Sequence, residues 1–419
     1  MTSKNPLQLD GKTGEGGGQL VRIACALAAV TSQPICIYHI RGNRGGTRGG
    51  GLKAQHVAAI QWLAEATEAK VDGLTVGSQY LEFRPSLPPT ALKRRQFDIV
   101  AGNSASSTLL IFQAIFPFLL FAGNKDGETI ELEIHGGTNT SFSPSYEYMD
   151  QVLLPTLHDK FGISVERKLK KRSWAIGPLS RGSIWLKFQP LPPGQPLKLQ
   201  QSWNRPITDE DFKIKRIDVT ILVPLALQEL LVTALSNDLD QSFPNVDVNF
   251  AFTEASGHDA RMYTLLVAHS NTGLRWGRDY LYDRAWKKRT PETISADISQ
   301  KVCRDLLEEI AARGVVDEHL QDQLVVFQAL SDGRTTFYRG AKPVETDIVD
   351  GVDEVDAALK DLQLEKTWKK DKTEDPFGEG STHTTTVRWV ASKLLPTVQW
   401  FNKGTICDGA GVSFPSPPQ

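Results

Sequence analysis

The stretch GEGGGQLVR, residues 14–22, combines side chains and backbone groups that could hold an anion. Its three consecutive glycines permit close approach of the backbone to a ligand, and they lead into an apolar pattern that predicts a helix ending near Val30. The free N–H groups at a helix start attract anions, and Gln19 and Arg22 share one face of the first turn. Glu15 would repel an anion unless a divalent cation, Mg²⁺ or Mn²⁺, bridged its carboxylate to a phosphate. The alternative is a flexible turn that carries a surface arginine.

Two familiar nucleotide-binding motifs do not match this region. The sequence DGKTG resembles the end of a P-loop, but that motif needs a glycine where this chain has Pro6. The dinucleotide pattern GxGxxG fails because Gly14 and Gly16 are followed by Gln19 in place of the third glycine. The identity of the anion is therefore left open by the loop alone.

A second glycine-rich stretch, RGNRGGTRGGGLKAQH, contains Arg41, Arg44 and Arg48. Arginine makes bidentate contacts with phosphate oxygens and keeps its charge at all physiological pH values. The stretch lies between a predicted strand, PICIYHI, and a predicted amphipathic helix, LKAQHVAAIQWLAEAT, which favours an ordered loop over a disordered RGG-like linker.

One histidine differs from the others in its setting. His383 lies among small hydroxyl residues in STHTTTVRW, at the predicted start of a late helix where Ser381 or Thr382 could cap. A helix start favours the neutral imidazole, which is the form that can act as a nucleophile. A capped helix start without catalysis is the alternative. Regular patterns surround three further histidines and predict surface or core roles for them: His56, His158 and His269.

Composition excludes several classes of protein. The chain has 419 residues and a formal net charge of -2, so a generally basic nucleic-acid coat is excluded and only a local basic patch is allowed. Four cysteines show no CxxC pairing, which favours reduced thiols inside the cell over structural zinc. The most apolar run, TLLIFQAIFPFLLFA, is shorter than the roughly 20 residues of a membrane span. It predicts a buried helix that bends or ends near Pro117.

The order of predicted elements recurs along the chain. Glycines, an apolar helix, a strand and a second helix occupy the first part, and the same order resumes at FDIVAGNSASS. A weaker third copy begins at DEHLQDQLVVFQAL and resumes at THTTTVRWVASKLLP. This self-similarity predicts repeated α/β units, each with helices on one face of a sheet.

Two segments interrupt the repeats. Residues 183–283 alternate strands around one helix and predict a smaller inserted α/β domain, which leaves residues 1–182 and 284–419 as the core. Residues 340–380 are rich in Asp, Glu and Lys and predict a surface insertion with at most one short helix.

Five segments carry a resemblance to a known family: LDGKTGEGGGQLVR, IRGNR followed by GLKAQH, GGT at Gly136, EHLQDQL and STHTTT. In this order they resemble the RNA 3′-terminal phosphate cyclase family over nearly the whole chain, and the first segment is the most specific. The resemblance implies an α+β fold, in which a large domain of three repeated α/β units carries a smaller inserted domain. It also implies conversion of an RNA 3′-phosphate to a 2′,3′-cyclic phosphate with ATP and a divalent metal.

The same resemblance implies roles for individual residues. His383 corresponds to the nucleophile that takes AMP from ATP, and Glu15 corresponds to the metal ligand. Two further groups follow from the matching: Gln19, Arg22, Arg41, Arg44 and Gln55 would line the phosphate and RNA-end pocket, and Gln113, Pro144, His319, Asp322 and Gln323 would contact the adenine nucleotide.

The chain departs from the family pattern in a few places. Val387 replaces an asparagine that commonly follows the nucleophile. The loop after Arg44 is longer than usual in the family, so Arg44 and Arg48 are both candidates for the role assigned to Arg44. GPLSRGS replaces a glycine triplet, and the acidic insertion is also unusual. Catalytically inactive relatives, which serve in ribosome assembly and rRNA processing, are one alternative, but they lose the nucleophile that this chain keeps. An enolpyruvate-transferring synthase would share the repeat without explaining His383.

The partners and location follow from the same reasoning. RNA 3′-phosphate ends and ATP are the predicted partners, with no membrane association. The basic run RKLKKR, which begins at Arg167, and the insertions favour a nuclear location, with the cytoplasm as the alternative. An exposed basic element is the competing interpretation of that run.

Overall fold

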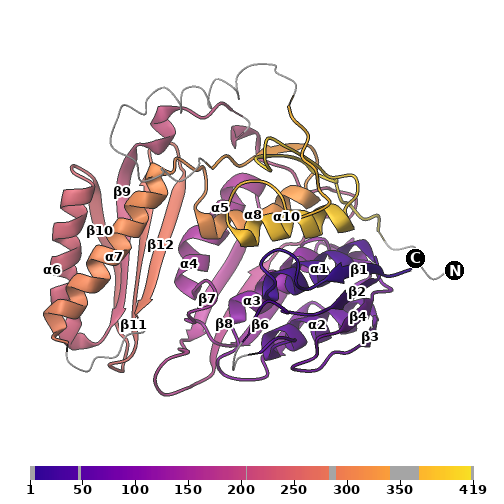
Figure 1. The fold of residues 1–419 in the computed structure, drawn as a ribbon, viewed down its shortest axis with the longest axis horizontal. Helices are drawn as coiled ribbons and strands as arrows, with labels where there is room; N and C mark the ends of the chain where they lie inside the picture. Colours follow the sequence, from indigo (N-terminus) through magenta and orange to yellow (C-terminus); the bar gives the residue numbers. More distant parts are fainter. Residues whose placement is uncertain (1–4, 46–48, 204, 283–288, 340–367, 417–419) are drawn as a thin grey trace. The chain divides into compact units, whose positions relative to one another are not determined.

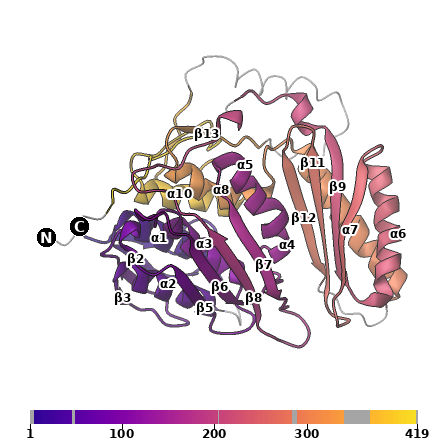
Figure 2. The same ribbon diagram turned by 180° about the vertical axis from the view of Figure 1, so that it is seen from behind.

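The computed structural model describes residues 5–45, 49–203, 205–282, 289–339 and 368–416. The chain divides into two compact units (Figures 1 and 2). Unit 1 comprises Met1–Leu199, Gln321–Thr336 and Asp371–Gln419, and unit 2 comprises Gln200–Leu320 and Phe337–Lys370. Both contain sheets and helices, which confirms the predicted α+β class.

The first sheet of unit 1 has the strand order β1-β2-β4-β3. Its strands β1 and β2 are parallel, whereas β4 is antiparallel to both β2 and β3. A parallel pair needs a crossover connection, and helix α1 supplies it between β1 and β2. The elements are β1 (Leu7–Asp10), α1 (Gly18–Thr31), β2 (Ile35–Tyr38), α2 (Ala54–Thr67), β3 (Lys70–Asp72), β4 (Leu81–Arg84) and the short η1 (Pro89–Ala91).

The second sheet repeats this arrangement in the order β5-β6-β8-β7. Strands β5 and β6 are parallel, and β8 is antiparallel to both β6 and β7. Helix α3 makes the crossover, and the Ser107 hydroxyl accepts the Leu110 N–H at its start (3.3 Å). The elements are β5 (Gln96–Val100), α3 (Thr108–Leu120), β6 (Ile130–Gly136), α4 (Tyr146–Tyr148), η2 (Met149–Leu153), α5 (Leu154–Phe161), β7 (Val165–Lys171) and β8 (Gly182–Phe188).

A third, smaller sheet of unit 1 has the order β13-β15-β14, with β15 antiparallel to both neighbours. Its elements are α8 (Glu318–Leu330, of which Gln321 onward belongs to unit 1), β13 (Arg334–Thr336), α10 (Thr382–Leu394), β14 (Gln399–Phe401) and β15 (Ile406–Asp408). The first two sheets thus share one topology, and the description of unit 1 as three repeats stays a prediction.

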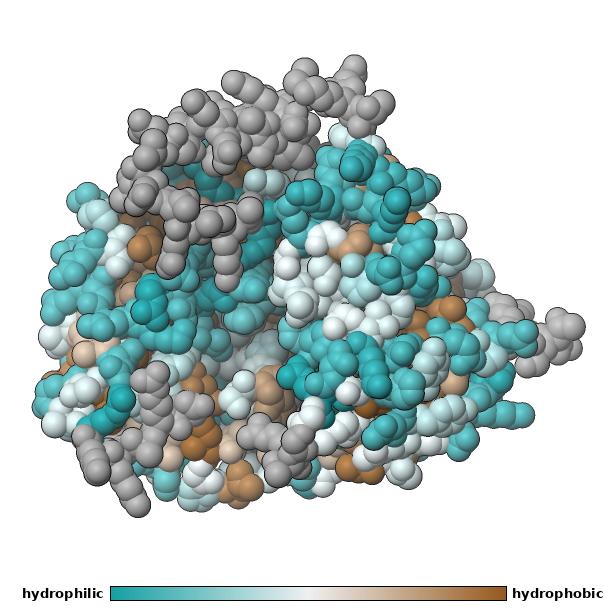
Figure 3. Space-filling view, viewed as in Figure 1, coloured by the Kyte–Doolittle hydropathy of each residue, from teal (hydrophilic) through white to brown (hydrophobic). Residues whose placement is uncertain are grey.

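Helix α1 lies inside the core of unit 1, where it packs against α2, α3 and α10. Every residue from Gln19 to Val30 is buried. Helix α3 is also almost wholly apolar and buried, as predicted, but it continues through Pro117 to Leu120 instead of ending there. No described helix is long and apolar enough to cross a membrane. On the face drawn in Figure 3, hydrophobic residues are scattered among hydrophilic ones.

Unit 2 contains one sheet with the order β10-β9-β11-β12 and two long helices, α6 and α7, which pack against each other. Helix α6 buries a leucine at every fourth position, from Leu227 to Leu239, as expected of an amphipathic helix. The elements are η3 (Gln201–Trp203), η4 (Asp209–Phe212), β9 (Ile214–Val223), α6 (Leu225–Ser242), β10 (Asp247–Ala255), β11 (Met262–Ser270), β12 (Arg275–Tyr282) and α7 (Pro291–Ala311).

The division of the chain differs from the one expected from the sequence. Strand β8, expected in the inserted domain, pairs with β6 and β7 in unit 1, and α7, expected in the core, belongs to unit 2. Alternating hydrophobicity identifies a strand without identifying its partner, so the boundary could not be drawn from the pattern. Of the acidic segment, residues 340–367 lie outside the described residues, and residues 368–380 form no helix.

Candidate functional site

The glycines before α1 let several side chains approach the start of this helix. Gly14 and Gly16 have positive φ angles of 65° and 59°. A Cβ atom at Gly16 would lie 2.2 Å from Asn43 Nδ2, and one at Gly18 would lie 2.7 Å from His56 Nε2. No side chain among the described residues caps α1, so the first N–H groups of this helix have the capacity to bind an anion.

Arg22 joins α1 to α3 beneath this loop. Its Nε donates to Gln113 Oε1 (2.8 Å), and its Nη2 donates to Gln19 Oε1. Burial lowers the pKa of the Arg22 guanidinium to about 10, while the charges of Glu15 and Asp322 oppose that shift. Arg22 therefore stays charged at neutral pH, within reach of four other predicted site residues.

The loop after β2 brings two arginines to Glu15. Arg44 forms an ion pair with the Glu15 carboxylate, whose Oε2 is buried without a hydrogen-bond partner among the described residues. Arg41 has a positive φ of 55°, and its Nη1 donates to the carbonyls of Gly49 (3.4 Å) and Gly51 (3.3 Å). Burial and the charge of Arg44 lower the pKa of Arg41. Arg48, the competing candidate, lies outside the described residues.

His56, for which no site role was predicted, is buried at the start of α2 beside Gly18. Its Nδ1 accepts the Lys53 backbone N–H (3.1 Å), so the neutral ring carries its proton on Nε2, which has no partner in the described part of the chain. Burial and the neighbouring charges of Arg22, Arg41 and Lys53 hold the pKa of His56 well below its ordinary value. The adjacent Gln55 is half-buried in the first turn of α2. That adjacency was the only signal in the sequence.

His383 lies in the first turn of α10, as predicted. The Ser381 hydroxyl accepts the Thr384 N–H (3.1 Å) and caps this helix. Three residues after His383, and on the same helix face, the Thr386 hydroxyl accepts the Glu15 N–H (2.9 Å). This bond brings residues near the two ends of the sequence together, and no pattern in the sequence had pointed to Thr386.

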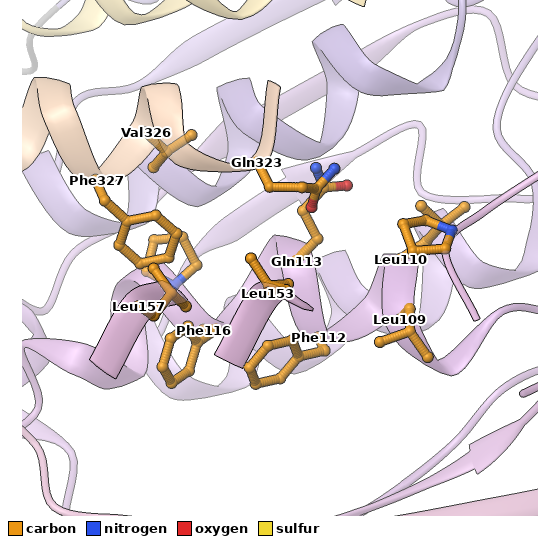
Figure 4. A pocket seen from close by; sticks show the side chains of 12 residues that line it. Leu109, Leu110, Phe112, Gln113, Phe116, Leu153, Leu157, Gln323, Val326 and Phe327 are labelled. Atoms are coloured by element: carbon orange, nitrogen blue, oxygen red, sulfur yellow. The ribbon is translucent and has the colours of Figure 1, made fainter. Parts of the chain in front are cut away.

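An apolar pocket lies beside Arg22, lined by α3, α5, α8, η2 and Pro144 (Figure 4). Its polar side chains are Gln113 and Gln323, which reach toward one another across it (Figure 4). Gln323 Nε2 donates to Asp322 Oδ1 (2.6 Å). The remaining lining residues are Leu109, Leu110, Phe112, Phe116, Pro117, Leu153, Leu157, Val326 and Phe327.

His319 is the one predicted nucleotide contact that belongs to unit 2. Its Nε2 lies 3.1 Å from Arg278 Nη1 on β12, and Arg278 also forms ion pairs with Glu309 and Glu318. Among the described residues, His319 is therefore tied to a charged network of unit 2 and is absent from the lining of the apolar pocket.

Ten buried polar side-chain atoms of unit 1 have no hydrogen-bond partner among the residues that the structure describes. Six of them belong to predicted site residues or to residues adjacent to these in the sequence, and we call these six residues the unpaired cluster. Burying a polar group without a partner costs about 1–3 kcal/mol, so a ligand or a water molecule that completes the bonding is favoured at such groups. The members are Glu15 (Oε2), Gln19 (Nε2), His56 (Nε2), Gln113 (Nε2), Gln321 (Oε1) and His383 (Nδ1).

The cluster can serve an anion together with a cation. Three of its atoms, on Gln19, His56 and Gln113, are N–H donors suited to phosphate oxygens. The free oxygen of Glu15 fits one position around Mg²⁺ or Mn²⁺. Within the described part of the chain, no group of three or more His, Cys, Asp and Glu residues could hold a metal by itself, so phosphates and water would supply the other ligands.

Comparison with known proteins identifies the family of the chain. The family model for RNA 3′-terminal phosphate cyclase matches residues 13–398. The chain belongs to this family. It is 30% identical over 332 residues to the cyclase of Ignicoccus hospitalis, covering 78% of this chain and 86% of that protein. It is 32% identical over 340 residues to the cyclase of Methanosarcina mazei, covering 79% of this chain and 89% of that protein.

Family membership confirms the resemblance found in the sequence, whereas the individual roles stay predictions. Val387, which replaces the asparagine common in the cyclase family, is fully buried in α10. The Glu15 backbone N–H nevertheless donates to the Thr386 hydroxyl on the helix that carries His383. The substitution therefore leaves the hydrogen bond between α10 and the loop of residues 14–17 intact.

Proposed function

We propose that this chain is an ATP-dependent RNA 3′-terminal phosphate cyclase. It would convert an RNA 3′-phosphate to a 2′,3′-cyclic phosphate and release AMP and pyrophosphate. The observation that carries the proposal is the unpaired cluster, in which three N–H donors, a carboxylate oxygen and the Nδ1 atom of His383 are buried without partners among the described residues. The names of the relatives support the same reaction.

The reaction would proceed by three substitutions at phosphorus. A ring nitrogen of His383 attacks the α-phosphorus of ATP, forming an N–P bond as the bond to pyrophosphate breaks. An oxygen of the RNA 3′-phosphate then takes the AMP, which breaks the N–P bond. Finally the 2′-hydroxyl attacks the RNA phosphorus, loses its proton and displaces AMP. Positioning and neutralisation of charge dominate such transfers.

The residues of the site fit these needs. Gln19, Arg22, Arg41 and Arg44, with Gln55 beside them, would neutralise and orient the phosphates of ATP and RNA. Glu15 would hold a divalent cation, which when bound would offset phosphate charge.

The apolar pocket suits the adenine base. Gln113, Pro144 and Gln323 line it, and Asp322 is hydrogen-bonded to Gln323. Because Gln113 also binds Arg22, base and phosphates would occupy neighbouring parts of one site. The contact of His319 with the nucleotide stays a prediction.

The test is transfer of label from α-labelled ATP to the protein in the presence of a divalent cation, followed by denaturing electrophoresis. We expect acid-labile, base-stable label on the wild type, and none on His383→Ala. His258→Ala, at an exposed histidine of unit 2, is the control and should retain the label. A folded wild type that binds RNA but takes no label would instead support the inactive, ribosome-assembly role.

We further propose an intracellular location, because all four cysteines are buried free thiols. A nuclear location has less support. The basic run at Arg167 lies in and just after strand β7, where Arg167, Lys170 and Arg172 are paired with Asp150, Glu133 and Glu147. The relatives named above are archaeal and offer no information on a nucleus.

A further inference from the structure

The hydroxyl group of Thr386 joins the loop of residues 14–17, which we call the glycine loop, to α10, the helix that carries the proposed nucleophile His383. Thr386 Oγ1 donates to the Thr382 carbonyl (2.6 Å) within α10 and accepts the Glu15 backbone N–H (2.9 Å). Thr386 is fully buried, so water does not offer the Glu15 N–H an equal partner at this point. The bond therefore spans 371 positions of the sequence and connects the two residues with proposed chemical roles.

Gly14 shows how closely the loop lies on Thr386. A Cβ atom at Gly14 would lie 2.2 Å from Thr386 Oγ1 and 3.3 Å from Pro376 Cγ. The φ angle of Gly14, 65°, is also one that other residues rarely adopt. The loop backbone therefore rests directly on the Thr386 side chain.

We propose that Thr386 is a positioning residue that sets the distance between Glu15 and His383. It rests on the proposed function. Arg44 orients one oxygen of the Glu15 carboxylate, while Thr386 fixes the backbone that carries it. His383 lies three residues before Thr386 on the same helix face, so one hydroxyl orients the metal-binding loop relative to the nucleophile.

The expected effect falls on the rate of the first chemical step. The groups proposed to hold phosphate, Gln19 and Arg22, lie on α1, whereas the nucleophile lies on α10. A shift between the two helices would leave phosphate binding intact but misalign the attack, and a misplacement of about 1 Å can cost about 100-fold in rate. Loss of the Thr386 hydroxyl should thus lower kcat for adenylylation with little change in the KM for ATP.

The test compares Thr386→Val, which keeps the side-chain shape, with Thr386→Ser, which keeps the hydroxyl. We expect Thr386→Val to lower kcat about 10- to 100-fold with KM within threefold of wild type, and Thr386→Ser to retain most of the rate. Thr385→Val is the matched control, because among the described residues the Thr385 hydroxyl bonds to the Thr382 carbonyl of its own helix (3.2 Å) and to no residue of the loop that carries Glu15. A normal kcat for Thr386→Val, or an equal loss for Thr386→Ser, would overturn the proposal.

A second measurement separates this proposal from the proposed function. Hydrogen exchange of the peptide that contains Glu15, followed by mass spectrometry on the full-length protein, needs no catalysis. Protection of the Glu15 amide should fall in Thr386→Val and persist in Thr386→Ser and Thr385→Val. Unchanged protection in Thr386→Val would refute the positioning role, whereas an unlabelled wild type with the expected exchange pattern would refute the enzyme function alone.

Discussion

The two ends of the candidate site differ in how many polar side chains they bury. At the start of α1, Glu15, Gln19 and His56 bury polar atoms that have no partner among the described residues. In the apolar pocket, by contrast, ten of the lining side chains carry only carbon, and the polar ones are Gln113 and Gln323. Gln113 belongs to both ends, because its Oε1 accepts from Arg22 and its Nε2 is unpaired.

This difference separates two kinds of ligand recognition. Buried groups without partners destabilise the free protein by about 1–3 kcal/mol each, and a ligand that completes their bonds recovers that free energy. Apolar walls need no partner and select a ligand by its shape. We therefore expect substitutions at the polar end to act on chemistry and on pH dependence, and substitutions in the apolar pocket to act on affinity for the base.

The largest expected effect distinguishes two buried arginines. Burial lowers the pKa values of Arg22 and Arg388 to about 10. Arg22 contacts the unpaired cluster, whereas Arg388 donates to the Glu379 carbonyl (2.5 Å) and fills space left by Gly378 and Gly404. Arg22→Lys should reduce the rate of adenylylation per folded molecule about 100-fold, because an ammonium group cannot replace the two-pronged hydrogen bonding of a planar guanidinium.

The matched variant Arg388→Lys should act on stability instead. We expect its free energy of unfolding to fall by about 1–3 kcal/mol while its adenylylation rate per folded molecule stays within threefold of wild type. Denaturant unfolding and label transfer measure the two quantities. Equal loss of rate in both variants would mean that loss of any buried guanidinium lowers activity, whatever its place relative to the site.

The second prediction concerns pH. An unfolded histidine protonates near pH 6.5, but the neighbouring charges and burial keep His56 neutral in the folded protein at lower pH. The unfolded state then binds the additional proton, so the free energy of unfolding should fall by up to about 1.4 kcal/mol per pH unit below pH 6.5. His56→Gln should remove this contribution, whereas His258→Gln, at an exposed position, should retain it. Parallel stability curves for wild type and His56→Gln would contradict the buried neutral ring.

The sequence predicted where the helices of this site begin better than it predicted which distant segments contact them. Glycines before an apolar run identified the start of α1, and hydroxyl residues around His383 identified the start of α10, because both signals come from adjacent residues. The contact of Glu15 with Thr386 could not be predicted this way, since it depends on how two distant segments pack. For the same reason the place of β8 in unit 1 could not be predicted, because the hydrophobic pattern of a strand does not identify the strand with which it pairs.

His56 shows how a site residue escapes detection in a regular pattern. It lies in an amphipathic helix, where a histidine on the buried face has an ordinary structural explanation. Its role became visible only from the Gly18 backbone that approaches its Nε2 and from the cations around it. Both features are products of tertiary packing, which a single sequence does not display.

The smallest expected effect tests the apolar pocket with two adjacent valines of α8. Val325 and Val326 are both buried, but only Val326 lines the pocket. Replacing either by alanine removes two methyl groups and should lower the free energy of unfolding by about 2 kcal/mol. Val326→Ala should also raise the KM for ATP about fivefold with kcat nearly unchanged, because contact with the base is lost equally before and during the chemical step. If Val325→Ala raised the KM for ATP as much, the effect would come from a general loosening of α8. The proposal that the apolar pocket binds the adenine base would then be contradicted.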